Sequence, residues 1–287
     1  MTLEVHEWPA SAPGAPVILA AHGITANGLS WGPVAEHLGG AVTLLAPDLR
    51  GRAGSRDVPG PYGLARHADD MIAILDDRGV DSAVPAGHSM GAYVAALAAV
   101  RRPDRATAVV MVDGGLAVPL PPGTDVQALL TATLGPAIER LDTTFASREQ
   151  YREFWRRHPA FGFAWTPALD AYLQHDLIGD GPYRSSCVAE AIRVDGADMF
   201  AGPEATAAFD RLSVPAVLLW ADRGLFDQSP GAYTAERTAG LKVPAERVPD
   251  TNHYSILAGG GAAAVAAHLV RAATTARTAA PPAGPRP

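Results

Sequence analysis

The chain has 287 residues, 48% of them hydrophobic and 18% charged, which is enough apolar material for one large domain with a substantial core. Its net charge of −7 gives no reason to expect nucleic acid or an anionic membrane as a partner. The single cysteine, Cys187, excludes an intramolecular disulfide. The first residues lack the features of a signal peptide, and no apolar run reaches the roughly 18 residues of a membrane helix, so we expect a cytoplasmic protein.

Six short apolar runs predict strands. They are continuously apolar rather than alternating, as in parallel strands that are buried on both faces. In chain order they cover residues 17–21, 42–46, 80–86, 108–112, 216–220 and, more weakly, 245–248. Helical patterns separate several of them, at residues 31–38, 65–78 and 92–102, and a further helix is predicted at 260–273. This alternation predicts a parallel α/β sheet.

One long segment breaks the alternation. Residues 116–208 are largely helical in pattern, contain no clear buried strand and carry many aromatic side chains. We interpret this segment as a helical cap inserted into a core that comprises residues 1–115 and 209–273. The remaining residues, 274–287, show no hydrophobic pattern and are expected to be disordered.

The stretch Gly87-His88-Ser89-Met90-Gly91 has the form G-x-S-x-G, the nucleophile elbow of serine hydrolases. A predicted strand precedes it and an Ala-rich helical stretch follows, which is the context that makes the pattern meaningful. The serine must occupy a strained turn that projects its Oγ above the sheet edge, and the flanking glycines avoid collisions there. We therefore predict Ser89 as a nucleophile and expect the His88 side chain to point away from the site.

A serine hydroxyl needs a base, and histidine titrates near neutral pH. His253 follows the last predicted strand and precedes the last predicted helix, so it should lie at the same sheet edge as Ser89. We predict His253 as the base. His158 and His175 lie in the proposed cap, where we expect them to pack or to face water.

Two backbone amides are predicted to form an oxyanion hole. His22-Gly23 directly follows the first predicted strand, so the next amide, that of Ile24, is well placed to donate to a developing oxyanion. The amide of Met90, at the start of the helix after the nucleophile, is the expected second donor. Backbone amides suit this role because they are rigid and already oriented.

The chain resembles the α/β-hydrolase superfamily in four features that occur in the family's order: His22-Gly23, the loop from Asp48 to Ser55, the elbow at residues 87–91, and Asn252-His253. The resemblance covers most of the chain apart from the cap and the tail. It implies a mainly parallel, eight-stranded sheet. It also implies that Ser89 is the nucleophile, that His253 is the base, and that the Ile24 and Met90 amides form the oxyanion hole.

The acid of the triad departs from the family's usual pattern. The family usually places it three residues past a glycine that follows the late strand, but here Ala221 replaces that glycine and the acid position holds a glycine. Some members instead carry the acid after the strand that follows the nucleophile helix, and Asp113 occupies that position. We predict Asp113 as the acid that orients the histidine, with Asp222 and then Asp227 as alternatives.

These residues favour a serine hydrolase that cleaves a carboxylic ester or lactone of a medium-sized, apolar small molecule through an acyl-enzyme on Ser89. Epoxide hydrolases and dehalogenases of the family attack with an aspartate, so a serine disfavours those activities. A carbon–carbon bond hydrolase of a diketone-like substrate, or a non-hydrolytic cyclase or binding protein, remains an alternative. We expect no metal and no cofactor, because the chain shows neither zinc-ligand spacing nor a nucleotide fingerprint. A homodimer is left open.

Overall fold

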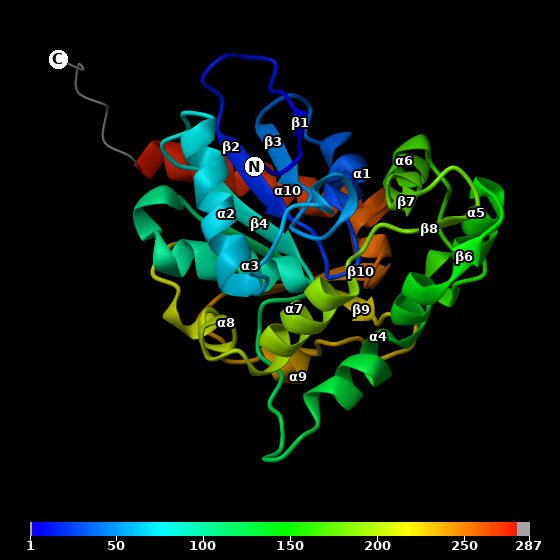
Figure 1. Ribbon diagram of the computed structural model, residues 1–287. Coiled ribbons are helices and arrows are strands. Elements are labelled where there is room, and N and C mark those ends of the chain that lie inside the picture. Colours follow the sequence, from blue (N-terminus) through cyan, green and yellow to red (C-terminus); the bar gives the residue numbers. More distant parts are fainter. Residues whose placement is uncertain (1, 280–287) are drawn as a thin grey trace.

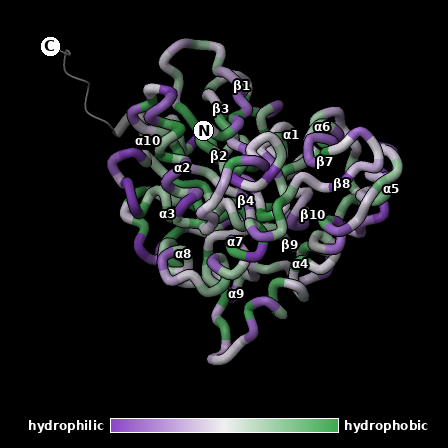
Figure 2. The backbone as a smooth tube through the Cα atoms, viewed as in Figure 1, coloured by the Kyte–Doolittle hydropathy of each residue, from purple (hydrophilic) through white to green (hydrophobic). Residues whose placement is uncertain are grey.

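A seven-stranded sheet runs through the centre of the described chain, residues 2–279 of the computed structural model (Figure 1). The strand order is β1-β3-β2-β4-β5-β9-β10, and every neighbouring pair is parallel except β1 with β3. The strands are β1 (Val5–Trp8), β2 (Val17–Ala21), β3 (Thr43–Pro47), β4 (Val84–His88), β5 (Val109–Val112), β9 (Ala216–Arg223) and β10 (Ala245–Asn252). Hydrophobic residues concentrate along these central strands (Figure 2), as burial on both faces requires.

The expectation of a parallel α/β sheet is confirmed, but the expected eighth strand is absent from residues 2–279. The segment before β2 contributes only the antiparallel edge strand β1. Pro9, Pro13 and Pro16 follow β1 within this short stretch, and proline cannot donate to a strand ladder. The N-terminal segment therefore has room for one strand and not two.

Helices cover both faces of the sheet. On one face lie α2 (Leu64–Asp77) and α3 (Met90–Arg101), and on the other lie α1 (Gly32–Ala35) and α10 (Gly259–Ala279). The short α9 (Ala235–Thr238) precedes β10. Helix α3 is almost wholly buried, because its many alanines allow it to press between the sheet and α2.

Residues 116–208, called the insert below, leave the sheet after β5 and return to it at β9. The insert contains α4 (Val126–Asp142), α5 (Arg148–Arg156), α6 (Pro167–His175), α7 (Ala189–Ala201) and α8 (Pro203–Ala207). Helices α5 and α6 share a separate apolar cluster, whereas α7 and α8 pack on α2 and α3 (Figure 1). The insert therefore has one part with its own core and another part that is continuous with the main core.

The insert also holds strands that the sequence pattern did not predict. A three-stranded antiparallel sheet has the order β6-β8-β7 and comprises Thr144–Phe145, Tyr183–Ser185 and Leu177–Ile178 respectively. Strands of two or three residues are too short to show a periodic pattern, which is why the largely helical pattern of this segment did not reveal them.

The C-terminal helix is longer than expected. Helix α10 continues to Ala279, so residues 274–279 are helical rather than disordered. The extension contains alanines, threonines and an arginine, with no proline before position 281, and adding residues to an existing helix costs little. The rest of the expected disordered tail lies outside the described residues.

Candidate active site

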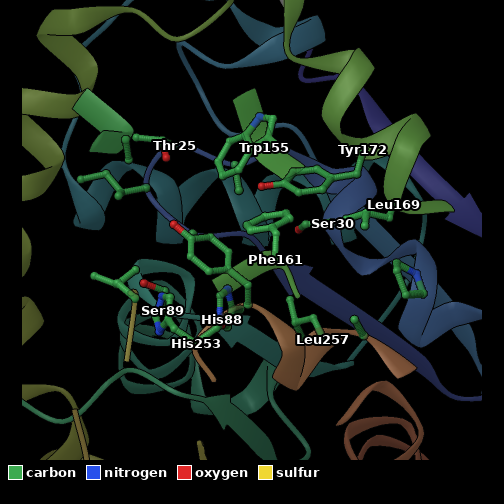
Figure 3. Close-up of a pocket in the computed structure, with 18 of the residues that line it drawn as sticks. Thr25, Ser30, His88, Ser89, Trp155, Phe161, Leu169, Tyr172, His253 and Leu257 are labelled. Atoms are coloured by element: carbon green, nitrogen blue, oxygen red, sulfur yellow. The ribbon is translucent and has the colours of Figure 1, made fainter. Parts of the chain in front are cut away.

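The turn that carries Ser89 joins β4 to α3. Ser89 has a φ of 56°, a left-handed conformation that residues other than glycine rarely adopt. A Cβ atom at Gly87 would overlap the carbonyl of Gly91, and one at Gly91 would overlap the carbonyl of Ala21. The two glycines therefore allow the chain to close this turn, and Ser89 lines a pocket above the sheet edge (Figure 3).

His253 and Asp113 form a hydrogen-bonded pair at the same edge. His253 directly follows β10, and its Nδ1 lies 2.6 Å from Oδ2 of Asp113, which directly follows β5. The other carboxylate oxygen of Asp113 accepts the Ala221 amide at 3.1 Å. A buried carboxylate held in this way favours the tautomer with a proton on Nδ1, so the ring presents Nε2 as a base.

The chain turns sharply after Asp113, which brings it against the nucleophile turn. Asp113 itself has a positive φ of 45°, and a Cβ at Gly114 would overlap the carbonyl of Ser89. The amide of Ser89 donates to the carbonyl of Val112 at 2.9 Å. The nucleophile turn and the acid-bearing turn are thus packed directly on each other.

The two alternative acids are engaged elsewhere. Asp222 forms an ion pair with Arg247, and this hydrogen bond lowers the pKa of the Asp222 carboxyl. Asp227 pairs with Arg223 at 2.7 Å and accepts from the Asn252 side chain at 2.8 Å. Of the three aspartates predicted as candidates, Asp113 is the one whose carboxylate faces the His253 ring.

His88 lies in the pocket wall, so the expectation that it points away from the site was wrong (Figure 3). Its Nε2 donates to the carbonyl of His253 at 2.7 Å, and the two rings lie 4.6 Å apart. Burial holds the pKa of His88 well below its usual range, so the ring is a neutral donor. The side-chain direction of a residue at the mouth of a strained turn does not follow strand alternation, which is why sequence reasoning missed it.

The two predicted oxyanion amides come from the expected elements. Ile24 lines the pocket, and Met90 is the first residue of α3, where an amide has no acceptor within the helix. The carbonyl of Ile24 accepts from Nε of Arg52 at 3.0 Å, and that of Thr25 accepts from Arg140 at 3.0 Å. Two buried guanidinium groups therefore fix the loop that carries the Ile24 amide.

Both arginines pair with aspartates of the insert. Arg52 binds Asp195 of α7, and Arg140 of α4 binds Asp176, which follows α6. Burial alone would raise the pKa of Asp195, but the charges of Arg52 and His67 outweigh burial and hold it below its usual range. Buried charges of this kind persist only when they are paired and hydrogen-bonded, so the insert and the Ile24 loop depend on each other.

The pocket above Ser89 is mainly apolar and has a volume of about 60 Å³. The insert contributes aromatic and aliphatic side chains to it, namely Leu134, Ala137, Trp155, Phe161, Phe163, Leu169 and Tyr172. The core contributes further apolar residues, among them Leu225, Tyr254 and Leu257. The hydroxyl of Ser30 also lines the pocket, is buried and has no hydrogen-bond partner among the described residues, so it is available to a substrate.

The remaining candidates from the sequence lie outside this pocket. His158 stacks on Phe226 with ring centroids 5.7 Å apart, and burial lowers its pKa. Cys187 is buried, and burial raises its pKa, which disfavours a thiolate nucleophile. His175 joins a separate cluster that is described below. Among residues 2–279 no helix is both long and apolar enough to cross a membrane.

Comparison with known proteins identifies the class. The model of the alpha/beta hydrolase family matches residues 17–268, and the chain belongs to this family. Lipase LipV of Mycobacterium tuberculosis is 30% identical over 178 residues, which are 62% of this chain and 64% of the lipase. Epoxide hydrolase A of the same species is 38% identical over 120 residues, which are 41% of this chain and 36% of that enzyme. The matches thus span less than two thirds of these relatives.

Solved structures with the same fold cover almost the whole chain. The crystal structure of E-2-(acetamidomethylene)succinate hydrolase has a TM-score of 0.72 at 22% identity and covers 96% of this chain and 95% of its own. A thermophilic esterase from Thermogutta terrifontis has a TM-score of 0.66 at 20% identity, and the match covers 94% of both chains. At this level of identity the likeness shows the fold alone. The family match and the fold thus agree, and both place the chain among the alpha/beta hydrolases.

Proposed function

We propose that the protein is a serine hydrolase that cleaves a carboxylic ester or lactone through an acyl-enzyme on Ser89. The observation that carries the proposal is the convergence of Ser89 with the His253–Asp113 pair on one apolar pocket. A catalytic serine and histidine often reach hydrogen-bond distance only when substrate is bound. The proposal therefore rests on the fact that both side chains line one pocket.

The reaction follows from these positions. Nε2 of His253 accepts the Ser89 proton as Oγ attacks the substrate carbonyl carbon, and the Ile24 and Met90 amides stabilise the oxyanion. His253 then gives the proton to the departing alkoxide, which leaves as an alcohol. Water, deprotonated by His253, then attacks the acyl carbon. As the bond from that carbon to Oγ breaks, His253 returns the proton to Oγ of Ser89, and a carboxylic acid is released. Asp113 keeps the ring oriented and stabilises its charged form throughout.

The pocket lining supports an apolar substrate of limited size. A volume of about 60 Å³ is small beside the roughly 300–1,000 Å³ of pockets that hold drug-sized ligands. Short acyl groups fit the pocket as it stands, whereas longer chains need the wall formed by Trp155 and Phe161 to move. The Ser30 hydroxyl suits a substrate with a second oxygen, because a buried polar group left unpaired carries a free-energy cost.

A substrate panel tests this proposal. We would assay p-nitrophenyl esters from acetate to octanoate beside a set of lactones and an enolisable diketone, using the wild type and the Ser89→Ala variant. We expect ester or lactone turnover that favours short acyl groups and disappears in Ser89→Ala. We also expect Ser30→Ala to raise KM for substrates with a second oxygen while it spares simple acetates. Cleavage of the diketone alone would replace the ester assignment with carbon–carbon hydrolysis, and binding without turnover would contradict a hydrolase.

A further inference from the structure

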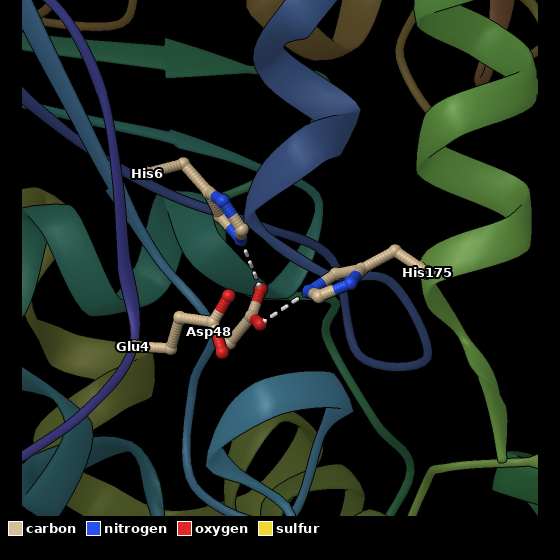
Figure 4. A group of neighbouring side chains, drawn as sticks. All are labelled: Glu4, His6, Asp48 and His175. Carbon is tan, nitrogen blue, oxygen red and sulfur yellow. Dashed lines mark hydrogen bonds and ion pairs between the residues drawn. The ribbon is translucent and has the colours of Figure 1, made fainter.

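Four potential metal ligands converge where the insert meets the core, away from the pocket. Glu4 directly precedes β1, His6 lies within β1, Asp48 follows β3, and His175 ends α6 of the insert (Figure 4). Each offers one nitrogen or oxygen atom, and these four atoms all lie within 4.8 Å of one another. None of the four lines the pocket above Ser89.

Asp48 is the fixed centre of this cluster. Its side chain is fully buried, and its two oxygens accept the Gly28 amide at 2.7 Å and the Gly54 amide at 2.9 Å. Nε2 of His6 lies 3.1 Å from one oxygen, and Nε2 of His175 lies 2.7 Å from the other. The carboxylate is therefore held in place before any further ligand binds.

The two imidazole rings are arranged to share one partner. Their centroids are 5.0 Å apart with an interplanar angle of 83°, and both Nε2 atoms point to the same carboxylate. Both rings are partly exposed and Glu4 is exposed, so an ion has a route from solvent. Two nitrogens and two oxygens from separate side chains form a ligand set that zinc accepts.

We propose that Glu4, His6, Asp48 and His175 form a four-coordinate Zn²⁺ site. Ligand atoms about 2.0–2.2 Å from a tetrahedral ion lie roughly 3.3–3.6 Å from each other, so side-chain shifts of about an ångström complete the site. Each ring binds through the Nε2 lone pair, and the proton on that nitrogen moves to Nδ1 or to solvent. The two carboxylates balance the ion's charge, and four protein ligands leave no open position for catalysis.

Such an ion would tie one wall of the pocket to the core. Helix α6, which ends at His175, also carries Leu169 and Tyr172 of the pocket lining. His175 lies more than a hundred residues after the other three ligands, so no local spacing motif could reveal the set. The expectation of no metal rested on that missing motif, and it does not bear on a site assembled by the fold.

Metal content and thermal stability test the site in the full chain. Protein treated with a chelator and desalted would be titrated with Zn²⁺, and retained metal would be measured by mass spectrometry after a second desalting step. We expect one equivalent of zinc, a higher Tm, and visible absorption typical of tetrahedral Co²⁺ when cobalt replaces zinc. The His6→Gln/His175→Gln double variant should retain none, while His37→Gln, an exposed histidine, should match the wild type.

A milder variant keeps the test valid if the double variant fails to fold. Glu4→Gln changes only an exposed side chain and should weaken zinc binding at least tenfold, with unchanged circular dichroism. Binding should also weaken as the pH falls, because protons compete with the ion for the imidazole nitrogens. Equal zinc retention by the wild type and the double variant would overturn the proposal. So would a wild type that retains no zinc and shows no shift in Tm.

Discussion

The core and the insert contribute to the same pocket by different physical means. In the core, Ser89, Asp113 and His253 each follow a parallel strand, so the backbone of the sheet brings them to one edge. In the insert, buried ion pairs help to fix position: Arg52 of the core binds Asp195, and Arg140 binds Asp176 within the insert itself. The difference teaches that the proposed reacting groups are positioned by strand order, whereas buried charge pairs help to hold the pocket wall and the Ile24 loop in place.

The largest effect should come from the acid of the core. Asp113→Asn should lower kcat by about 10²–10⁴-fold, because an amide favours the wrong tautomer of His253 and no longer stabilises its charged form. Steady-state kinetics on the best ester would measure this, with circular dichroism to confirm folding. Asp222→Asn and Asp227→Asn are matched controls and should stay within tenfold of the wild type. A large loss in Asp222→Asn with an active Asp113→Asn would contradict the assignment.

A glycine substitution tests whether catalysis depends on the contact between the Ser89 turn and the Asp113 turn. Gly114→Ala places a Cβ against the carbonyl of Ser89, so the nucleophile turn must shift. A displacement of about an ångström can cost roughly a hundredfold in rate, and we expect a kcat loss of that order. Gly260→Ala, which has open space around its Cβ, serves as the control for a glycine substitution. Unchanged kcat in Gly114→Ala would show that the contact of the two turns is unimportant.

The insert should respond mainly through stability. Asp176→Asn leaves the buried Arg140 without its counter-charge and weakens hydrogen bonds from Tyr151 and Ser185, so we expect a loss of about 3–5 kcal/mol in the free energy of unfolding. Urea denaturation would measure it, and the exposed Asp180→Asn should cost little. The variant should also lose activity, because Arg140 holds the Thr25 carbonyl. Equal stability of the two variants would argue against a role for the ion pair.

The smallest effect is the pH dependence of stability that arises where His175 of the insert pairs with Asp48 of the core. Burial alone would raise the pKa of Asp48, but hydrogen bonds from His175 and His6 outweigh it, and the pKa stays below its usual range. The stability from Asp48 is therefore present above about pH 4 and is lost as pH falls below that value. The hydrogen bond to Asp48 raises the pKa of His175, so its contribution is complete below about pH 6.5 and is lost as pH rises through the raised pKa.

This linkage predicts a particular change in the pH profile of Tm. With a chelator present, the Tm of the wild type should show a small decline as the pH rises above 6.5. His175→Gln should flatten that decline and leave the Tm at acidic pH similar. His37→Gln should behave as the wild type. Identical profiles for wild type and His175→Gln would show that the ion pair adds nothing measurable.

The sequence predicted the parts of the site that follow from local pattern and chain order. Ser89, His253 and Asp113 could be located because parallel strands end at one edge and the elbow has a recognisable sequence. The pairing of Arg52 with Asp195 could not be predicted, because it joins residues more than a hundred positions apart. The same reason applies to the zinc-ligand cluster. The orientation of His88 depended on a strained turn that strand alternation does not describe.

Covalent labelling of Ser89 tests the central claim most directly. The folded wild type would be treated with a fluorophosphonate, digested and analysed by mass spectrometry, beside Ser89→Ala and the control Ser82→Ala, whose residue lies outside the pocket. The account predicts a single adduct on the peptide that contains Ser89, absent from Ser89→Ala and unchanged in the control. A folded wild type without an adduct on Ser89 would contradict a serine hydrolase mechanism at this site. So would equal labelling of the wild type and Ser89→Ala.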